Sequence, residues 1–192
     1  MTDTQQEHYL FIVDAHAPEF EIPYDVKGIV RGVWVPFLLT DPASMSAIIL
    51  VSVLHMRFSS GHREPCRALL QLKAFMFGTI NRALQDCERA CSDQLIVAVF
   101  NAAICEAVFG SANIYHVHMR GLMRMISIRG GLTQLGDLGF IKDYVARVLL
   151  WYDVNCASIV GCGRYLDGTE FTDPADILPA DQENFSVGVL KS

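Results

Sequence analysis

Cysteine, histidine and acidic side chains are the residues of this chain whose types could serve a metal site. The six cysteines include two close pairs, Cys87 with Cys91 and Cys156 with Cys162. A structural zinc site needs several thiolate or imidazole ligands that converge on one ion, and neither pair has a histidine at ligand spacing. Cysteines in a reducing compartment usually stay free and behave as small hydrophobic residues. The sequence therefore predicts free thiols and no metal site.

Histidines within the predicted helices are candidates for catalysis or ion binding. His116 and His118 are two residues apart, which directs them about 200° apart around a helix, so they cannot share one ion. His55 lies within an apolar segment and is predicted to be a packed core residue. No serine stands between glycines at a strand-to-helix turn, and no His-Glu-x-x-His pair occurs. The sequence therefore predicts no catalytic residue and no bound cofactor.

Arginines form a basic stripe on the segment that follows Tyr115. Arg120 and Arg124 are one helical turn apart and lie opposite the apolar residues of the same segment. Such a stripe could contact an anion or nucleic acid. It could also be a solvated face or a partner for the acidic ends of this chain. The second interpretation is favoured because the net charge is −6 and no aromatic residues alternate with the arginines.

The composition is more apolar and less charged than that of an average soluble domain, so the chain has few polar residues with which to cover its apolar ones. The 192 residues are 52% hydrophobic and 19% charged, with a mean hydropathy of +0.29, whereas an average soluble domain is roughly 25% charged. This content excludes disordered and low-complexity classes. The densest apolar run, Met45 to Leu54, is far shorter than the ~20 residues of a membrane-spanning helix, so no membrane segment is predicted. The polar, acidic start lacks the features of a secretory signal, which predicts an intracellular protein.

The charged residues divide the chain into three parts. Residues 1–27 and residues 165–192 each hold six acidic residues and one basic residue, while residues 28–164 hold thirteen Lys and Arg against nine Asp and Glu. We therefore expect an acidic N-terminal segment at 1–27, a structured domain at 28–164, and an acidic, irregular tail at 165–192. The expected domain is the basic and apolar part of the chain.

Apolar residues at helical spacing and capping signals predict helices throughout the central part. Asp41-Pro42 and Ser92-Asp93 are start signals, and glycines follow the ends. The expected helices cover residues 42–59, 64–88, 93–109, 112–128 and 140–160. The one strand-like run, Tyr9 to Val13, is equally well explained as an extended tail. The prediction is an all-α array of about five to six helices with irregular acidic ends.

Short motifs occur in a characteristic order between residues 20 and 165. They are Trp34-Val35-Pro36-Phe37, Asp41-Pro42 leading to Leu54-His55, Ser92-Asp93, Glu106 with Gly110, His118-Met119-Arg120-Gly121-Leu122, Arg129-Gly130-Gly131-Leu132, Leu135-Gly136, and Trp151 with Asp153. In this order the chain resembles the fungal-specific transcription factor domain, the helical regulatory region that usually follows a binuclear zinc-cluster DNA-binding module. The resemblance implies transcription regulation and residence in the nucleus.

The motif residues are predicted to have structural roles. Gly121 would let another backbone approach its helix, and Gly130-Gly131 would end that helix with a left-handed turn. Arg129 would complement the helix dipole. A buried Asp153 would need a partner, for which Arg129 is the candidate.

The chain departs from the resembled family in two ways. It contains no zinc cluster, and the family's helical region usually continues further. We therefore do not expect direct DNA binding from this chain alone, and we expect a protein partner or a homodimer. The alternatives are a small-molecule effector sensor with an apolar pocket and a truncated remnant of a larger regulator; an enzyme is the least favoured class. The apolar excess further predicts an uncovered apolar face among the helices of residues 42–160.

Overall fold

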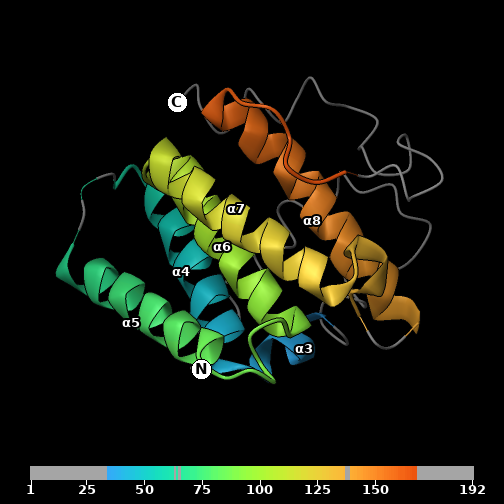
Figure 1. The fold of residues 1–192 in the computed structure, drawn as a ribbon. Coiled ribbons are helices and arrows are strands. Elements are labelled where there is room, and N and C mark those ends of the chain that lie inside the picture. The colour runs from blue at the N-terminus through green and yellow to red at the C-terminus, as the bar shows by residue number, and fades with distance from the viewer. Residues whose placement is uncertain (1–33, 63, 65, 137–138, 168–192) are drawn as a thin grey trace.

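The described part of the chain is built from helices that pack side by side (Figure 1). The computed structural model describes residues 34–62, 64, 66–136 and 139–167. Its elements are α3 (Val35–Leu39), α4 (Pro42–Ser59), α5 (Arg67–Leu84), α6 (Asp93–Phe109), α7 (Ala112–Arg129), the 3-10 helix η3 (Leu132–Gln134) and α8 (Gly139–Val160). These residues contain no strand, and the all-α prediction is confirmed. The strand-like run Tyr9–Val13, the segment 1–27 and most of the tail lie outside the described residues.

Helix α6 is the centre of the fold. Its sequence is apolar on every side, which is typical of a buried helix, and all but one of its side chains from Asp93 to Glu106 are buried. It packs against α4, α5, α7 and α8. In Figure 1 it lies behind α7 and beside α4. The core therefore surrounds α6, and it includes Leu50 of α4, Phe100 of α6 and Met119 of α7.

Most helix ends follow from local signals. The helices predicted at 42–59, 93–109, 112–128 and 140–160 begin and end within one residue of the observed bounds. The helix predicted at 64–88 is shorter, because Cys66 is extended and the chain turns after Leu84. In that turn the Asp86 carboxylate accepts a hydrogen bond from the N–H of Glu88, a local bond that competes with helix formation. Helix α3 was not predicted as a separate element.

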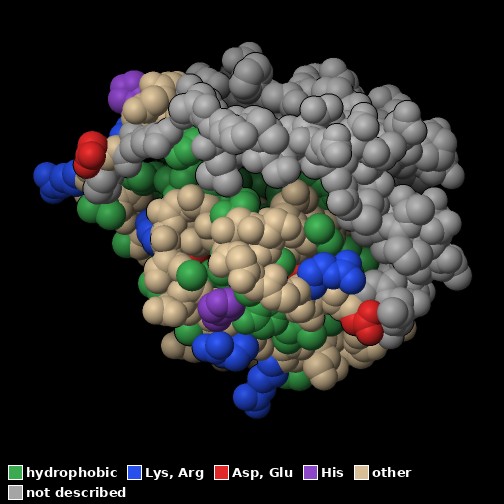
Figure 2. Space-filling view, turned by 90° about the horizontal axis from the view of Figure 1, so that it is seen from above, with side chains coloured by type: hydrophobic (Ala, Val, Ile, Leu, Met, Phe, Trp, Pro, Cys, Tyr) green, Lys and Arg blue, Asp and Glu red, His purple; other side chains and the backbone are tan. Residues whose placement is uncertain are grey.

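Large apolar side chains reach solvent mainly on α5 and α7. They are Leu70, Phe75 and Leu84 on α5 and Ile114, Val117 and Ile128 on α7, with exposures between 42% and 66%. Figure 2 views the molecule from above and shows apolar side chains at the surface among polar and basic ones. Most of the exposed large apolar side chains of the described residues therefore lie on these two outer helices. None of the described helices is both long enough and apolar enough to cross a membrane.

Candidate functional site

Three of the sequence motifs meet at the buried carboxylate of Asp93, in the first turn of α6. Its oxygens accept hydrogen bonds from Arg129 Nε at 3.2 Å, from Arg129 Nη2 at 3.3 Å and from the backbone N–H of Gly136 at 2.9 Å. Arg129 is in the last turn of α7, and Gly136 follows η3. The carboxylate thus joins the start of α6, the end of α7 and the following loop. A position at a helix N-terminus also favours its negative charge.

The glycine pair after Arg129 makes this junction sterically feasible. Gly130 has φ +98° and ψ 15°, and Gly131 has φ +106° and ψ 172°. The second conformation is essentially restricted to glycine. The N–H groups of Gly130 and Gly131 donate to the carbonyls of Ser127 and Ile126, which closes the end of α7. The predicted left-handed turn is confirmed.

Asp41 has two roles at the start of α4. Its Oδ1 accepts hydrogen bonds from the N–H groups of Ala43 at 2.7 Å and Ser44 at 3.2 Å, as expected for a cap. Its Oδ2 accepts a hydrogen bond from Arg89 Nη2 at 2.5 Å. This ion pair ties the turn between α5 and α6 to the start of α4. Pro42 occupies the first position of the helix, where no N–H is needed.

Asp153 does not pair with Arg129, so that prediction was wrong. Arg129 is bound to Asp93, while Asp153 Oδ2 accepts hydrogen bonds from the backbone N–H groups of Tyr165 at 2.9 Å and Leu166 at 2.8 Å. The chain after α8 therefore folds back onto α8. Burial raises the pKa of Asp153, and the two backbone hydrogen bonds oppose this shift. The physical reason for the error is that backbone N–H groups can bind a buried carboxylate in place of a cation. They bind only one of its oxygens, since Asp153 Oδ1 is buried and has no hydrogen-bond partner among the described residues.

The same returning segment contacts the first turns of α7. Tyr165 hydrogen-bonds through its hydroxyl to His116 Nδ1 at 2.7 Å, and its ring packs edge-on against Tyr115. The hydroxyl of Tyr115 is buried, and burial raises its pKa. His116 is thus a hydrogen-bonded packing residue.

A second buried acid, Glu106, joins α5, α6 and α7. Its Oε1 lies 2.5 Å from Lys73 Nζ of α5, and its Oε2 accepts a hydrogen bond from the N–H of Ser111 at 3.1 Å. A Cβ atom at Gly110 would collide with this carboxylate, which explains why Glu106 and Gly110 form a motif. Glu106 therefore positions the start of α7 against the core.

His118 lies beside this ion pair and faces α5. Its ring stacks on Phe77 with centroids 5.5 Å apart. Burial lowers its pKa; the negative charge of Glu106 opposes this shift, whereas Lys73 adds to it. Its Nε2 is buried and has no hydrogen-bond partner among the described residues. His118 is thus a packing residue.

Other motif residues serve packing. Trp34 is buried and stacks on Phe37, and Trp151 is buried against Tyr152. Pro36 lies exposed in the first turn of α3. His55 is partly buried on α4 rather than in the core.

Gly121 is exposed on α7 and no backbone lies close to it. A Cβ atom there would meet nothing within 4 Å, so the predicted close approach is wrong. A glycine on a helix surface needs no such neighbour, and sequence alone does not distinguish the two cases.

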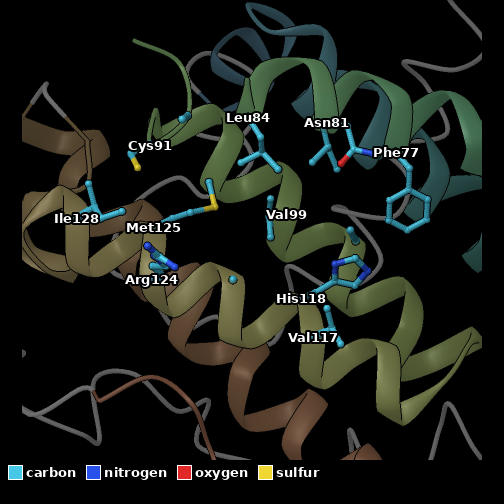
Figure 3. A pocket seen from close by; sticks show the side chains of 14 residues that line it. Phe77, Asn81, Leu84, Cys91, Val99, Val117, His118, Arg124, Met125 and Ile128 are labelled. Atoms are coloured by element: carbon cyan, nitrogen blue, oxygen red, sulfur yellow. The ribbon is translucent and has the colours of Figure 1, made fainter. Parts of the chain in front are cut away.

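An apolar groove of about 360 Å³ runs between α5 and α7 (Figure 3). Val99 of α6 lies at its floor, Leu84 projects from α5, and Val117 and Ile128 project from α7. The stacked rings of Phe77 and His118 stand at one end, and Cys91 stands at the other. Two motif residues, His118 and Gly121, are among those that line the groove.

No group of three or more His, Cys, Asp and Glu side chains in the described ranges could hold a metal ion. All six cysteines lie within these ranges and are free. Burial raises the pKa of the Cys105 and Cys156 thiols to about 12, so both are unreactive packing residues.

The comparison with protein families identifies the chain. The model of the fungal specific transcription factor domain matches residues 24–186. The chain belongs to this family. No curated protein and no solved structure matches it. Family membership places the chain among transcription regulators.

Two charged partners and the groove of this fungal transcription factor domain were missed by sequence reasoning. Lys73 and Arg89 lie on elements distant in sequence from Glu106 and Asp41. A buried acid on an apolar helix signals that a partner exists, but not which residue it is. The groove depends on how α5 and α7 pack on α6, and no local pattern contains that information.

Proposed function

We propose that this domain is a non-enzymatic regulator of transcription that acts in the nucleus through contacts with other proteins, without a DNA-binding module of its own. The observation that carries the proposal is the apolar groove with its exposed rims. Leu84, Val117 and Ile128 are 42%, 57% and 66% exposed, and contiguous exposed apolar surface commonly marks an interaction site. The buried acids Asp93 and Glu106 are bound by Arg129 and Lys73, so they serve the fold.

The placement of the cysteines supports the proposal that this domain does not itself form a DNA-binding module. Two of them are buried, one on α6 and one on α8, and the other four lie in segments next to helix ends. A zinc-cluster module instead needs thiolates that converge on metal ions. Regulation by this chain is therefore best explained by recruitment to a DNA-bound protein.

A small-molecule effector is the second candidate, and the groove volume favours it. About 360 Å³ lies in the range of ligand sites, roughly 300–1,000 Å³. Such sites, however, usually bury most of the ligand surface, and three of the apolar lining side chains here are themselves exposed. The protein partner is therefore preferred. A screen in which a metabolite raises the melting temperature of the chain would favour the effector instead.

A tethered reporter assay tests the proposal. The full chain is fused to a heterologous DNA-binding module, and transcription of a reporter is measured against the module alone. We expect the fusion to change reporter output and the double substitution Val117→Ser, Ile128→Ser to abolish the change. Both side chains are exposed, so circular dichroism should show an intact fold.

The matched control is Ile159→Ser, an exposed apolar residue of α8 outside the groove. It should retain the activity of the wild-type fusion. The proposal fails if the fusion leaves the reporter unchanged, or if the double variant regulates it as well as the wild-type chain does.

A further inference from the structure

The helices around the groove carry a one-sided charge. Helices α5 and α7 contain no Asp or Glu, although the whole chain has 21 acidic residues. Their basic residues are Arg67, Lys73 and Arg82 on α5 and Arg120, Arg124 and Arg129 on α7. Neither helix that walls the groove therefore carries an acidic residue, in a protein whose net charge is −6.

The two acids of α6 neutralise two of these six basic residues. They are Asp93 and Glu106, both buried and bound by Arg129 and Lys73. Arg82, Arg120 and Arg124 remain exposed, with no ion pair among the described residues. Arg124 itself lines the groove (Figure 3). The nearest acids along α5 are in the turn that follows it, at Asp86 and Glu88.

The length of the groove indicates what it can hold. Its α7 wall runs from Val117 to Ile128, which spans about 16 Å at 1.5 Å per residue. Its lining is mostly apolar, with Val99 and Ala102 of α6 at the floor and Met125 on the α7 side. A helix of about three turns that places one apolar face in the groove matches this length and lining.

We propose that the groove between α5 and α7 binds an amphipathic helix of a partner protein whose acidic side chains flank its apolar face. The apolar face lies on Val99, Val117 and Ile128, and a flanking carboxylate pairs with Arg124, the arginine that lines the groove. This inference rests on the proposed function and names the partner chemistry. Opposite charges on the two surfaces select acidic helices over basic ones.

Fluorescence anisotropy with designed peptides tests the proposal on the full chain. The probe is a labelled helix of about 14 residues with Leu and Phe on one face and Glu on both flanks; the matched peptide has Lys in place of Glu. We expect the acidic peptide to bind at least about tenfold more tightly than the basic one, and its affinity to fall as salt is added. Equal binding of the two peptides would overturn the assignment.

Variants locate the binding surface. Arg124→Glu should lower the affinity for the acidic peptide by about tenfold or more, because it replaces an attraction with a repulsion at the groove. The matched control Arg164→Glu changes an exposed arginine beyond α8 and should alter binding by less than about twofold. Val117→Ser should also weaken binding. The groove is not the site if Arg164→Glu matters as much as Arg124→Glu, or if Val117→Ser has no effect.

Two further readouts separate this inference from the proposed function. Light scattering of the chain alone should show a monomer. A dimer that dissociates more readily in the Arg124→Glu variant would mean that a second copy of the chain, and not a partner helix, occupies the groove. If the fusion regulates the reporter but the acidic peptide does not bind, only the inference that the partner is an acidic helix is refuted. A silent fusion would refute the proposed function itself.

Discussion

Removing the carboxylate of Asp93 should be among the most damaging single changes at the junction of α6 and α7. The Asp93→Ala variant loses two hydrogen bonds with Arg129 and one with the buried N–H of Gly136. Breaking a buried ion pair costs about 3–5 kcal/mol. The Arg129 side chain is 31% exposed, so it can recover part of this energy from water. We therefore expect the free energy of unfolding to fall by about 3 kcal/mol.

Urea unfolding followed by circular dichroism measures this loss directly. For a domain of this size, each kcal/mol corresponds to roughly 2–4 °C, so the melting temperature should fall by about 6–12 °C. Arg129→Met should cost less, about 1–2 kcal/mol, because Asp93 keeps the Gly136 hydrogen bond and its place at the helix N-terminus. The double variant should lose less than the sum of the two single variants.

The control for Asp93 is Glu88→Ala, which removes an exposed acid in the neighbouring turn. It should change the free energy of unfolding by less than about 0.5 kcal/mol. If Asp93→Ala lowers the free energy of unfolding by no more than Glu88→Ala does, the reasoning is refuted. Additive losses in the double variant would show that Asp93 and Arg129 do not act as a pair.

Three further predictions follow from single sites. Gly131→Val should lower the free energy of unfolding by more than about 1 kcal/mol, because residue 131 has a positive φ. Gly78→Ala should raise it by about 0.5–1 kcal/mol, because a Cβ atom at this position in the middle of α5 meets nothing. Equal melting temperatures for the wild type and the two variants would contradict both expectations. Burial raises the pKa of Asp153 above its ordinary 3.8, so its contribution to stability is full below that pH and is lost as pH rises through the raised pKa. Unfolding in urea from about pH 4 to about pH 7 should therefore show Asp153→Asn gaining stability relative to the wild type, and a constant difference would be the contrary result. Thiol titration of the native chain should modify exposed Cys87 and spare Cys105, whose pKa burial raises to about 12, until urea is added.

The helix ends were predictable because their signals are local. Asp41 and Ser92 cap α4 and α6 with their own side chains, and Gly130 ends α7 through its positive φ. Each signal acts within a few residues of the chain. The end of α5 was overestimated because residues 85–88 have no glycine or proline to mark a stop. What the turn provides instead is the contact of Arg89 with Asp41, which lies 48 residues away.

The partners of buried acids were not predictable, since several solutions satisfy the same electrostatic requirement. Asp153 is bound by backbone N–H groups, Glu106 by a lysine and Asp93 by an arginine. A sequence shows that each carboxylate needs a partner once it is buried. Only the packing of the helices decides which donor comes within reach.

The burial and pairing of the acids of α6 also explain how an acidic chain can leave an arginine unpaired at the groove. Asp93 and Glu106 are buried in α6, where Asp93 holds Arg129 at the end of α7 and Glu106 holds Lys73 within α5. Arg124 remains exposed on α7 and lines the groove. The core pairs position α7, and the surface arginines supply its charge. Substitutions in the two sets should therefore differ in kind: loss of a core pair should weaken peptide binding equally at all salt concentrations, whereas Arg124→Glu should weaken it most at low salt.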